Sequence, residues 1–416
     1  MARWPHHATA QSLIGALLCM TLAALPWSAG RTEETPQSPI HFTPRSIAFS
    51  LDSCETPERH APETMAGGVA VFDYDNDGYP DIFFANGAEI STLTKDSPKY
   101  WNRLFHNNGD GTFTDVTEKA GLKGTGFDVG VAVGDYDNDG YEDIFVGGVY
   151  RNTLYHNNGD GTFTDVTEKA GLAKLDKEYG PFWSVGAAWV DVNNDGLLDL
   201  FVVNYLRWDV NKEPDCKFGD KAEYCHPRFY KELPNQLFRN KGDGTFEDIS
   251  APSGIRSHPG KGMGVGVADY DGDGLPDIFV TNDKLFNFLF HNLGNYHFAE
   301  VAFETGGALP EHGNLISGMG VDFRDLNNDG LPTFSSWHWT RRPSRFTRTT
   351  ARVPSRKSLL KAAWPCSAIP CRVTARTSRT LITTDGRTFS SAAATCNRPP
   401  WPAAATSISP TPSSVT

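Results

Sequence analysis

Basic residues are scarce in most of this 416-residue chain. Residues 1–332 hold 25 Lys and Arg (38 in total less 13 beyond residue 332) against 49 Asp and Glu (50 in total less Asp385). That part has a formal net charge of −24 (25 − 49), which argues against nucleic acid as its partner. Residues 333–416 reverse this charge imbalance, with 13 basic residues and one acid. We therefore expect residues 333–416 not to belong to the same fold as the acidic part.

Long apolar runs are also missing, apart from Leu13–Leu25 near the start. This run is shorter than the roughly 20 residues that a membrane span needs. It follows Arg3 and precedes the small residues Ser28-Ala29-Gly30, which is the pattern of a signal peptide over residues 1–30. A transmembrane anchor is the alternative. We expect a mature chain with no membrane span that is secreted, periplasmic or on the cell surface.

Signatures of catalysis and of transition-metal binding are absent from the sequence. There is no nucleophile elbow or zinc signature, and the Gly-rich stretch Gly260–Gly266 lacks the features of a phosphate loop. Cysteine is sparse, at seven residues. In an exported chain Cys216 and Cys225 are close enough to form a disulfide, but the spacing does not decide whether they do.

Five acidic loops recur along the chain. The first, Asp73–Asp81, reads Asp-Tyr-Asp-Asn-Asp-Gly-Tyr-Pro-Asp, with carboxylates at positions 1, 3, 5 and 9 and Gly at position 6. Calcium takes about six to eight oxygen ligands, and alternate side chains plus the position 7 carbonyl supply most of them. The fifth loop is incomplete. The predicted Ca²⁺ ligands are Asp73, Asp75, Asp77, Tyr79, Asp81, Asp135, Asp137, Asp139, Tyr141, Asp143, Asp191, Asn193, Asp195, Leu197, Asp199, Asp269, Asp271, Asp273, Leu275, Asp277, Asp325, Asn327 and Asp329.

Two other interpretations of these acids fail. An EF-hand loop requires Glu at position 12 and flanking helices, but position 12 is Phe84, Val146, Val202 or Val280, within short apolar runs typical of strands. A glycoside hydrolase uses one pair of carboxylates at one active site, whereas this cluster occurs in every unit. The loops are therefore predicted to join β-strands and to hold metal.

A second motif alternates with the loops and completes each repeat. Residues His106–Leu122 and His156–Leu172 are identical over 17 positions. Each unit predicts four strands, which in the first unit are residues 67–72, 81–85, 103–106 and 112–117. Repeated four-stranded antiparallel units are typical of β-propeller blades. His106, His156 and His291 share one position, which favours a packing role for them over catalysis or transition-metal binding.

Three stretches, Pro62–Ala70, Tyr224–Pro227 and Gly260–Val265, read PETMAGGVA, YCHP and GKGMGV. With the repeats, they resemble FG-GAP or VCBS repeats, the calcium-loop blades also found in integrin α-subunit propellers. More narrowly, the chain is similar to the secreted CRTAC1-like (ASPIC/UnbV) family over residues 47–332. The resemblance implies a seven-bladed propeller followed by a small C-terminal domain. This sequence has fewer than seven blades, and no part of it resembles that domain.

The repeats break off inside the fifth loop, at Thr333. We therefore expect an all-β fold: an incomplete β-propeller of about four blades and a fragment over residues 47–332, after a lead-in over residues 31–46. Residues 333–416 are expected to be a disordered, low-complexity tail, which a frameshift in the coding sequence would explain; an ordinary linker is the alternative.

The sequence predicts a non-catalytic module that binds an extracellular protein or glycan. The alternative is a carbohydrate-active enzyme, such as a polysaccharide lyase, with a single site in the propeller funnel. Two insertions, residues 89–100 and 205–233, interrupt the repeats. The second is rich in aromatic residues, which either form a ligand surface or pack over the sheet edge: Trp208, Phe218, Tyr224, His226, Phe229 and Tyr230.

Overall fold

The computed structural model describes residues 44–310, 313–325, 332–339 and 347–351. The compact unit that contains the sheets begins at Arg45. The predicted signal peptide, nearly all of the lead-in and most of the tail lie outside the described residues, so these remain predictions. No helix among the described residues is long and apolar enough to cross a membrane.

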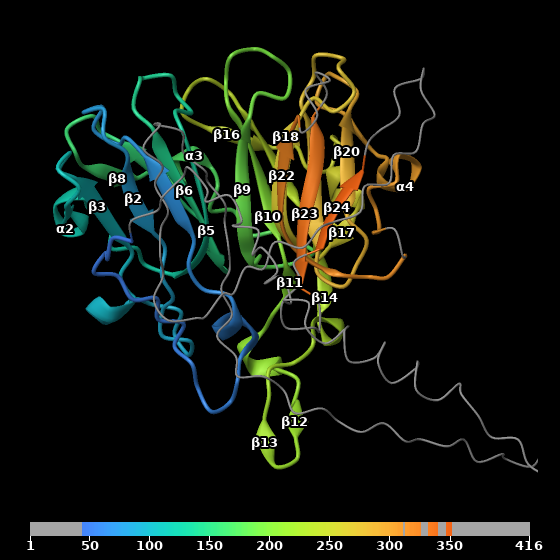
Figure 1. Cartoon of the computed structure of the whole chain (residues 1–416), viewed down its shortest axis with the longest axis horizontal. Helices are drawn as coiled ribbons and strands as arrows, with labels where there is room; N and C mark the ends of the chain where they lie inside the picture. Colours follow the sequence, from blue (N-terminus) through green and yellow to red (C-terminus); the bar gives the residue numbers. More distant parts are fainter. Residues whose placement is uncertain (1–43, 311–312, 326–331, 340–346, 352–416) are drawn as a thin grey trace, which may run out of the picture. The chain divides into compact units, whose positions relative to one another are not determined.

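Four antiparallel sheets of four strands follow one another along the chain (Figure 1). The first sheet consists of β1 (Val69–Phe72), β2 (Asp81–Phe84), β3 (Arg103–Asn107) and β4 (Phe113–Asp115). The second consists of β5 (Phe127–Gly134), β6 (Asp143–Val149), β7 (Thr153–Asn157) and β8 (Phe163–Asp165). The third consists of β9 (Ser184–Val190), β10 (Asp199–Asn204), β15 (Gln236–Asn240) and β16 (Phe246–Asp248). The fourth consists of β18 (Gly262–Ala268), β19 (Asp277–Asn282), β20 (Phe288–Asn292) and β21 (Phe298–Glu300).

A fifth sheet has three described strands: β22 (Ser317–Arg324), β23 (Thr333–Trp339) and β24 (Thr347–Ala351). The prediction of an incomplete all-β propeller, with about four blades and a fragment, is confirmed. The last two strands lie beyond residue 332, where the sequence carries no blade motif. Thr, Phe and Trp favour extended backbone, and β22 offers a free edge with which β23 pairs from Ser317 to Arg324.

Short helices connect the strands and were not predicted from the sequence. The one-turn helices α2 (Thr117–Ala120), α3 (Thr167–Ala170) and α4 (Ala302–Thr305) follow the outermost strands of three sheets, and each ends at a left-handed Gly. The 3₁₀ turns are η2 (Ala61–Thr64), η3 (Pro98–Tyr100), η4 (Val210–Lys212), η5 (Pro227–Phe229) and η6 (Ile255–Ser257).

The core lies between successive sheets, and the second strand of each sheet contributes to it from both faces. On β6, Ile144 and Val146 pack toward the first sheet, whereas Phe145 between them packs toward the third. Strand β10 repeats this alternation with Leu200 and Val202 against Phe201. Burial of both faces explains why these strands read as continuous apolar runs rather than as alternating sequences.

The first strands of neighbouring sheets approach so closely that glycine is needed at the contacts. A Cβ on Gly130 would lie 2.6 Å from the backbone carbonyl of Val185, and one on Gly264 would lie 2.9 Å from Gly320 Cα. The Gly-rich first strands of the repeats are therefore explained by packing.

The insertion at residues 205–233 builds a separate small layer. It contains β11 (Leu206–Arg207) and β14 (Lys231–Pro234), which pair together with β17 (Pro259–Gly260), and the hairpin β12 (Lys217–Phe218) and β13 (Lys221–Ala222). A disulfide joins Cys216 to Cys225 at the base of the hairpin. Because the insertion leaves β10 at its end, it lies at the opposite end of that strand from the acidic loop before Asp199.

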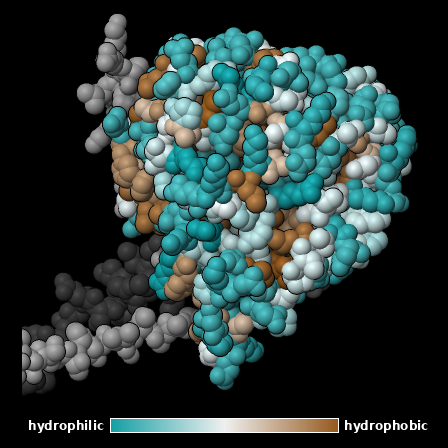
Figure 2. Space-filling view, turned by 180° about the vertical axis from the view of Figure 1, so that it is seen from behind, coloured by the Kyte–Doolittle hydropathy of each residue, from teal (hydrophilic) through white to brown (hydrophobic). Residues whose placement is uncertain are grey.

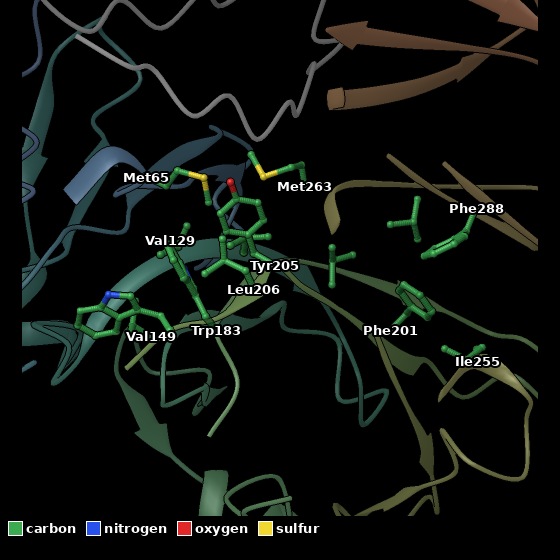
Figure 3. Packing of buried hydrophobic residues seen from close by; sticks show 14 of the residues in the cluster. Met65, Val129, Val149, Trp183, Phe201, Tyr205, Leu206, Ile255, Met263 and Phe288 are labelled. Carbon is green, nitrogen blue, oxygen red and sulfur yellow. The ribbon is translucent and has the colours of Figure 1, made fainter. Parts of the chain in front are cut away.

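The insertion packs onto the sheets through a buried cluster. Figure 3 shows Met65 and Met263 beside Tyr205, with Leu206 and Trp183 next to them. The rings of Trp183 and Tyr205 meet edge to face, with centroids 5.1 Å apart. This cluster fixes the base of the insertion on the ends of the first strands.

Candidate metal centres

Each of the four acidic loops that the structure describes in full closes on its first carboxylate. In the first loop, Asp73 accepts hydrogen bonds from the backbone N–H of Asp77 (3.0 Å) and Gly78 (2.8 Å), and Asp77 accepts one from Tyr79 N–H (2.8 Å). Gly78 has φ +88°, a conformation that only Gly adopts freely, which explains its place at position 6. The second, third and fourth loops repeat these bonds.

The position 9 carboxylates anchor the loops to the sheets. Asp81 is fully buried and accepts bonds from the backbone N–H of Asn107 (2.7 Å) on β3 and of Tyr74 (3.2 Å) in the loop. Asp143, Asp199 and Asp277 are buried in the same way. Their burial raises the pKa of Asp81 and Asp277 to about 6, of Asp199 to about 7 and of Asp143 to about 8. Four carboxylates whose burial opposes their ionisation are good partners for a cation.

Several predicted ligands converge on shared centres. Carboxylate oxygens of Asp73, Asp75 and Asp77 lie within 4.8 Å of one another, as do those of Asp135, Asp137 and Asp143. Buried polar atoms at these centres lack a hydrogen-bond partner, among them Asp75 Oδ1. Clustered oxygen donors with unused lone pairs fit the hard cation Ca²⁺. Backbone carbonyls at Tyr79, Tyr141, Leu197 and Leu275 complete the predicted donor sets.

The third and fifth loops differ from the others. In the third, Asn193 replaces the position 3 carboxylate and donates to Asp195 Oδ2 at 2.9 Å. In the fifth, Asp325 follows β22, whereas Asn327 and Asp329 lie outside the described residues, so a metal site there stays a prediction.

Two sets of side-chain amides link neighbouring loops, and the sequence analysis missed both. At position 4, Asn76 donates to Gly140 O of the next loop (2.9 Å), and Asn138 and Asn194 repeat this contact with Gly196 O (3.0 Å) and Gly274 O (2.9 Å). In the reverse direction, amides on the third strands of the second, third and fourth sheets reach the preceding loop; the pairs are Asn157 with Tyr74 O, Asn240 with Tyr136 O and Asn292 with Val192 O. The recurrence of Asn at position 4 was the available sequence signal.

The recurring histidines contact the acidic loops as well as packing on a ring. His106 lies edge to face with Tyr74 (centroids 6.1 Å apart), and its Nδ1 is 3.4 Å from Asp75 and 3.3 Å from Asp81. His156 Nδ1 lies 3.3 Å from Asp137 and 3.2 Å from Asp143. The predicted packing role is therefore incomplete, because the strand order that brings each histidine to its loop is not visible in the sequence.

The aromatic insertion divides into buried and exposed parts. Trp208 and Tyr230 are buried and both donate hydrogen bonds to Glu213, which supports the prediction that aromatics pack over the sheet edge. Phe218 on the hairpin and Phe229 on η5 are about half exposed, at 55% and 52%. Among the aromatic residues of the insertion, these two are the most exposed.

A one-off cluster of the kind expected of an enzyme occurs beside the insertion, but its polar groups bind one another. Tyr224 donates to the buried carboxylate of Glu63 (3.0 Å), and Arg59 contacts the same tyrosine. His60 Nδ1 lies 3.3 Å from Glu213. A hollow of about 460 Å³ lies elsewhere, where the segment 171–178 after the second sheet faces Phe238 and Phe246 of the third sheet. The arrangement is that of a structural tie between residues 55–64 and the insertion.

Comparison with known proteins shows which repeats these are. A model of the FG-GAP-like repeat matches residues 73–146, 139–202, 230–280 and 270–332, which is more than half of the chain. The chain is 26% identical over 285 residues to cartilage acidic protein 1 of Mus musculus and 25% identical over 287 residues to that of Homo sapiens, covering 67% of this chain in both cases. It spans about two fifths of the length of these relatives (41% and 40%).

Two solved structures show a distant likeness. One is an Agrocybe aegerita lectin that recognises non-reducing terminal N-acetylglucosamine, with TM-score 0.36, 18% identity and coverage of 66% of this chain and 61% of the lectin. The other is rhamnogalacturonan lyase YesW, with TM-score 0.36, 14% identity and coverage of 70% of this chain and 49% of the lyase.

Proposed function

The chain belongs to the family of FG-GAP-like repeat proteins, and we propose that it is a secreted, calcium-binding propeller that binds an extracellular protein or glycan without catalysing a reaction. The observation that carries the proposal is the repeated donor set: four described loops place acidic side chains in one frame, at the same end of successive sheets. A feature that recurs in every unit serves the fold rather than one reaction.

In the first, second and fourth loops Ca²⁺ would be held by carboxylates at positions 1, 3, 5 and 9 and the carbonyl at position 7. In the third, Asn193 would take the place of one carboxylate. Bound Ca²⁺ supplies positive charge that offsets the mutual repulsion of these acids. Because the donors come from a loop and the strand after it, the ion couples metal binding to folding.

Export is supported by the predicted signal peptide and by the disulfide between Cys216 and Cys225, since disulfides persist mainly in oxidising compartments. Extracellular calcium is abundant, which suits sites whose acids must otherwise repel one another. Both features favour a secreted or cell-surface protein.

The insertion supplies the proposed ligand surface. Figure 2 shows a mostly hydrophilic surface in which hydrophobic residues form small separate groups. Against that background, the exposed Phe218 lies inside the loop that the Cys216–Cys225 disulfide closes, and the exposed Phe229 follows that loop on η5. The guanidinium of Arg228 covers the ring of Phe229 at 4.8 Å. A restrained loop with exposed aromatics is a common recognition device, because little conformational entropy is lost on binding.

The test measures metal and ligand binding on the same preparation. Calorimetry with chelator-stripped protein is expected to show four Ca²⁺ per chain at least. The calcium-loaded protein is then applied to immobilised glycans and extracellular-matrix proteins, beside the variant Phe218→Ser/Phe229→Ser. Binding that the variant loses, with an unchanged melting temperature, supports the proposal. Absence of calcium binding, or release of unsaturated products from polysaccharides, contradicts it.

A further inference from the structure

The acidic loops fall into two classes according to the residue that faces them from the third strand of their sheet. In the first, second and fourth sheets that residue is a histidine. The nitrogen Nδ1 of His106, His156 and His291 lies 3.3, 3.2 and 3.0 Å from the buried position 9 carboxylate of its loop. Each imidazole also forms a compact group with two loop carboxylates, with one ligand atom from each within 4.8 Å of the others.

The third sheet departs from this pattern at both positions together. Asn193 takes the place of the position 3 carboxylate, and Arg239 takes the place of the histidine. Arg239 pairs with Glu247 on β16, at 2.7 Å, and its guanidinium lies 5.7 Å from the ring centre of Tyr296. The third loop therefore keeps oxygen donors but has no nitrogen donor beside them.

The position of Nδ1 indicates a ligand. In His106 and His156 this atom is buried and makes no hydrogen bond, although carboxylate oxygens lie within 3.4 Å of it. In His291 the same atom is at hydrogen-bond distance, 3.0 Å, from Asp277 Oδ1. With its proton on Nε2, each imidazole turns the electron pair of Nδ1 toward carboxylate oxygens, and a positive ion between them relieves the repulsion. With its proton on Nδ1, the ring instead donates a hydrogen bond to the carboxylate. Imidazole is a favoured donor for Zn²⁺ and other divalent transition metals, whereas Ca²⁺ takes oxygen.

We propose that the first, second and fourth loops each bind a divalent transition-metal ion through one histidine and two aspartates, in competition with Ca²⁺, and that the third loop binds Ca²⁺ alone. The assigned histidines are His106, His156 and His291. This inference rests on the proposed function, because it treats the acidic loops as metal sites. It assigns the histidines to metal selection, a role that the repeated carboxylates alone do not provide.

The test uses the full chain and Zn²⁺ as the probe, with Co²⁺ absorption as a second readout of nitrogen coordination. Calorimetry at saturating Ca²⁺ is expected to show three Zn²⁺ per chain. Each single variant His106→Gln, His156→Gln or His291→Gln is expected to bind one fewer, and the triple variant none at these sites. His297→Gln is the matched control, because within the described part of the chain the ring of this exposed histidine bonds only Asn295 O, in its own turn; it should leave the count at three.

Loss of zinc binding in the triple variant could also result from misfolding, so a second variant is designed to gain a zinc site. The double variant Asn193→Asp/Arg239→His gives the third loop the donors of the others and is expected to bind a fourth Zn²⁺. Zinc binding that survives in the triple variant overturns the proposal, as does a failure of the double variant to gain a site. Four bound Ca²⁺ without any Zn²⁺ overturns this inference alone, whereas binding of neither metal also removes the proposed function.

Discussion

The amide of Asn138 tests whether neighbouring loops stabilise one another. Its Nδ2 donates to Gly196 O of the third loop at 3.0 Å, while its own backbone has φ +59°. The substitution Asn138→Gly removes the hydrogen bond and keeps a residue that accepts positive φ. The substitution Asn138→Ala removes the bond and also leaves in the left-handed region a residue that tolerates it less well than Asn does. The pair of variants therefore separates the contact from the backbone conformation.

The expected magnitudes follow from these two terms. One hydrogen bond contributes about 1 kcal/mol net, so Asn138→Gly should lower the free energy of unfolding by that amount. Ala lacks the short polar side chain that eases the left-handed conformation for Asn, so this conformation costs Ala a further 1–2 kcal/mol, roughly, which brings Asn138→Ala to about 2–3 kcal/mol. The reverse contact, Asn240 Nδ2 to Tyr136 O at 2.7 Å, remains in both variants, so the junction should still form.

Urea unfolding at saturating Ca²⁺ measures both losses, and the m-value shows whether the unfolded state has changed. Asn76→Gly and Asn194→Gly make the same change at the neighbouring junctions and should give the same loss as Asn138→Gly. If Asn138→Gly is as stable as the parent chain with an unchanged m-value, the loops do not support one another through this amide and the reasoning fails.

Three further predictions concern the metal, the protons and the disulfide. Chelation with EDTA at pH 7.5 should lower Tm by tens of degrees, because four sites at about 2.7 kcal/mol each approach the total stability of a domain; an unmoved Tm would refute the calcium sites. Without metal, stability should fall as the pH rises from 5 to 8, because burial raises the pKa of Asp143 to about 8 and of Asp199 to about 7, so that the folded state holds protons that the unfolded chain releases near pH 4, roughly. Thermal melts in EDTA across this range would show the slope, Ca²⁺ should remove it, and a rise in stability with pH would contradict the assignment. Reduction of Cys216–Cys225 should cost about 2–3 kcal/mol and should speed proteolysis within residues 205–233 without changing Ca²⁺ stoichiometry; unchanged proteolysis would show that the disulfide does not restrain the insertion.

The loops and the strands beside them could be predicted because their signals are local. The Asp spacing and the Gly at position 6 define a turn within nine residues, and the apolar runs that follow them define buried strands. The contacts made by His106 and Asn138 could not be predicted in the same way, because they depend on which strand lies beside which loop. The spatial pairing, rather than the residue type, gives these side chains their roles.

The burial of polar residues also could not be predicted from the sequence. Lys95 lies in a polar insertion and would be placed on the surface, yet its side chain is 1% exposed and its ammonium donates to the carbonyls of Asn86, Gly87 and Tyr100. Asp128 lies 3.5 Å away as the counter-charge. The cost of burying the lysine is offset only by partners that the fold assembles, so a pattern of hydrophobicity could not reveal it.

Because of the paired amides at the junctions between loops, each repeat makes the same contacts with the repeats on either side of it. At each of three junctions one amide reaches forward to a backbone carbonyl and one reaches back, and main-chain acceptors are the same whatever side chain surrounds them. A copied unit therefore meets a complementary neighbour at either end, so a gene could lengthen by duplication without any new interface. The 17 identical residues of the first two units are what a late duplication would leave. In the fourth loop, position 4 is Gly272, which has no side chain. A repeat that follows this loop would therefore lack the forward amide hydrogen bond and keep only the reverse one.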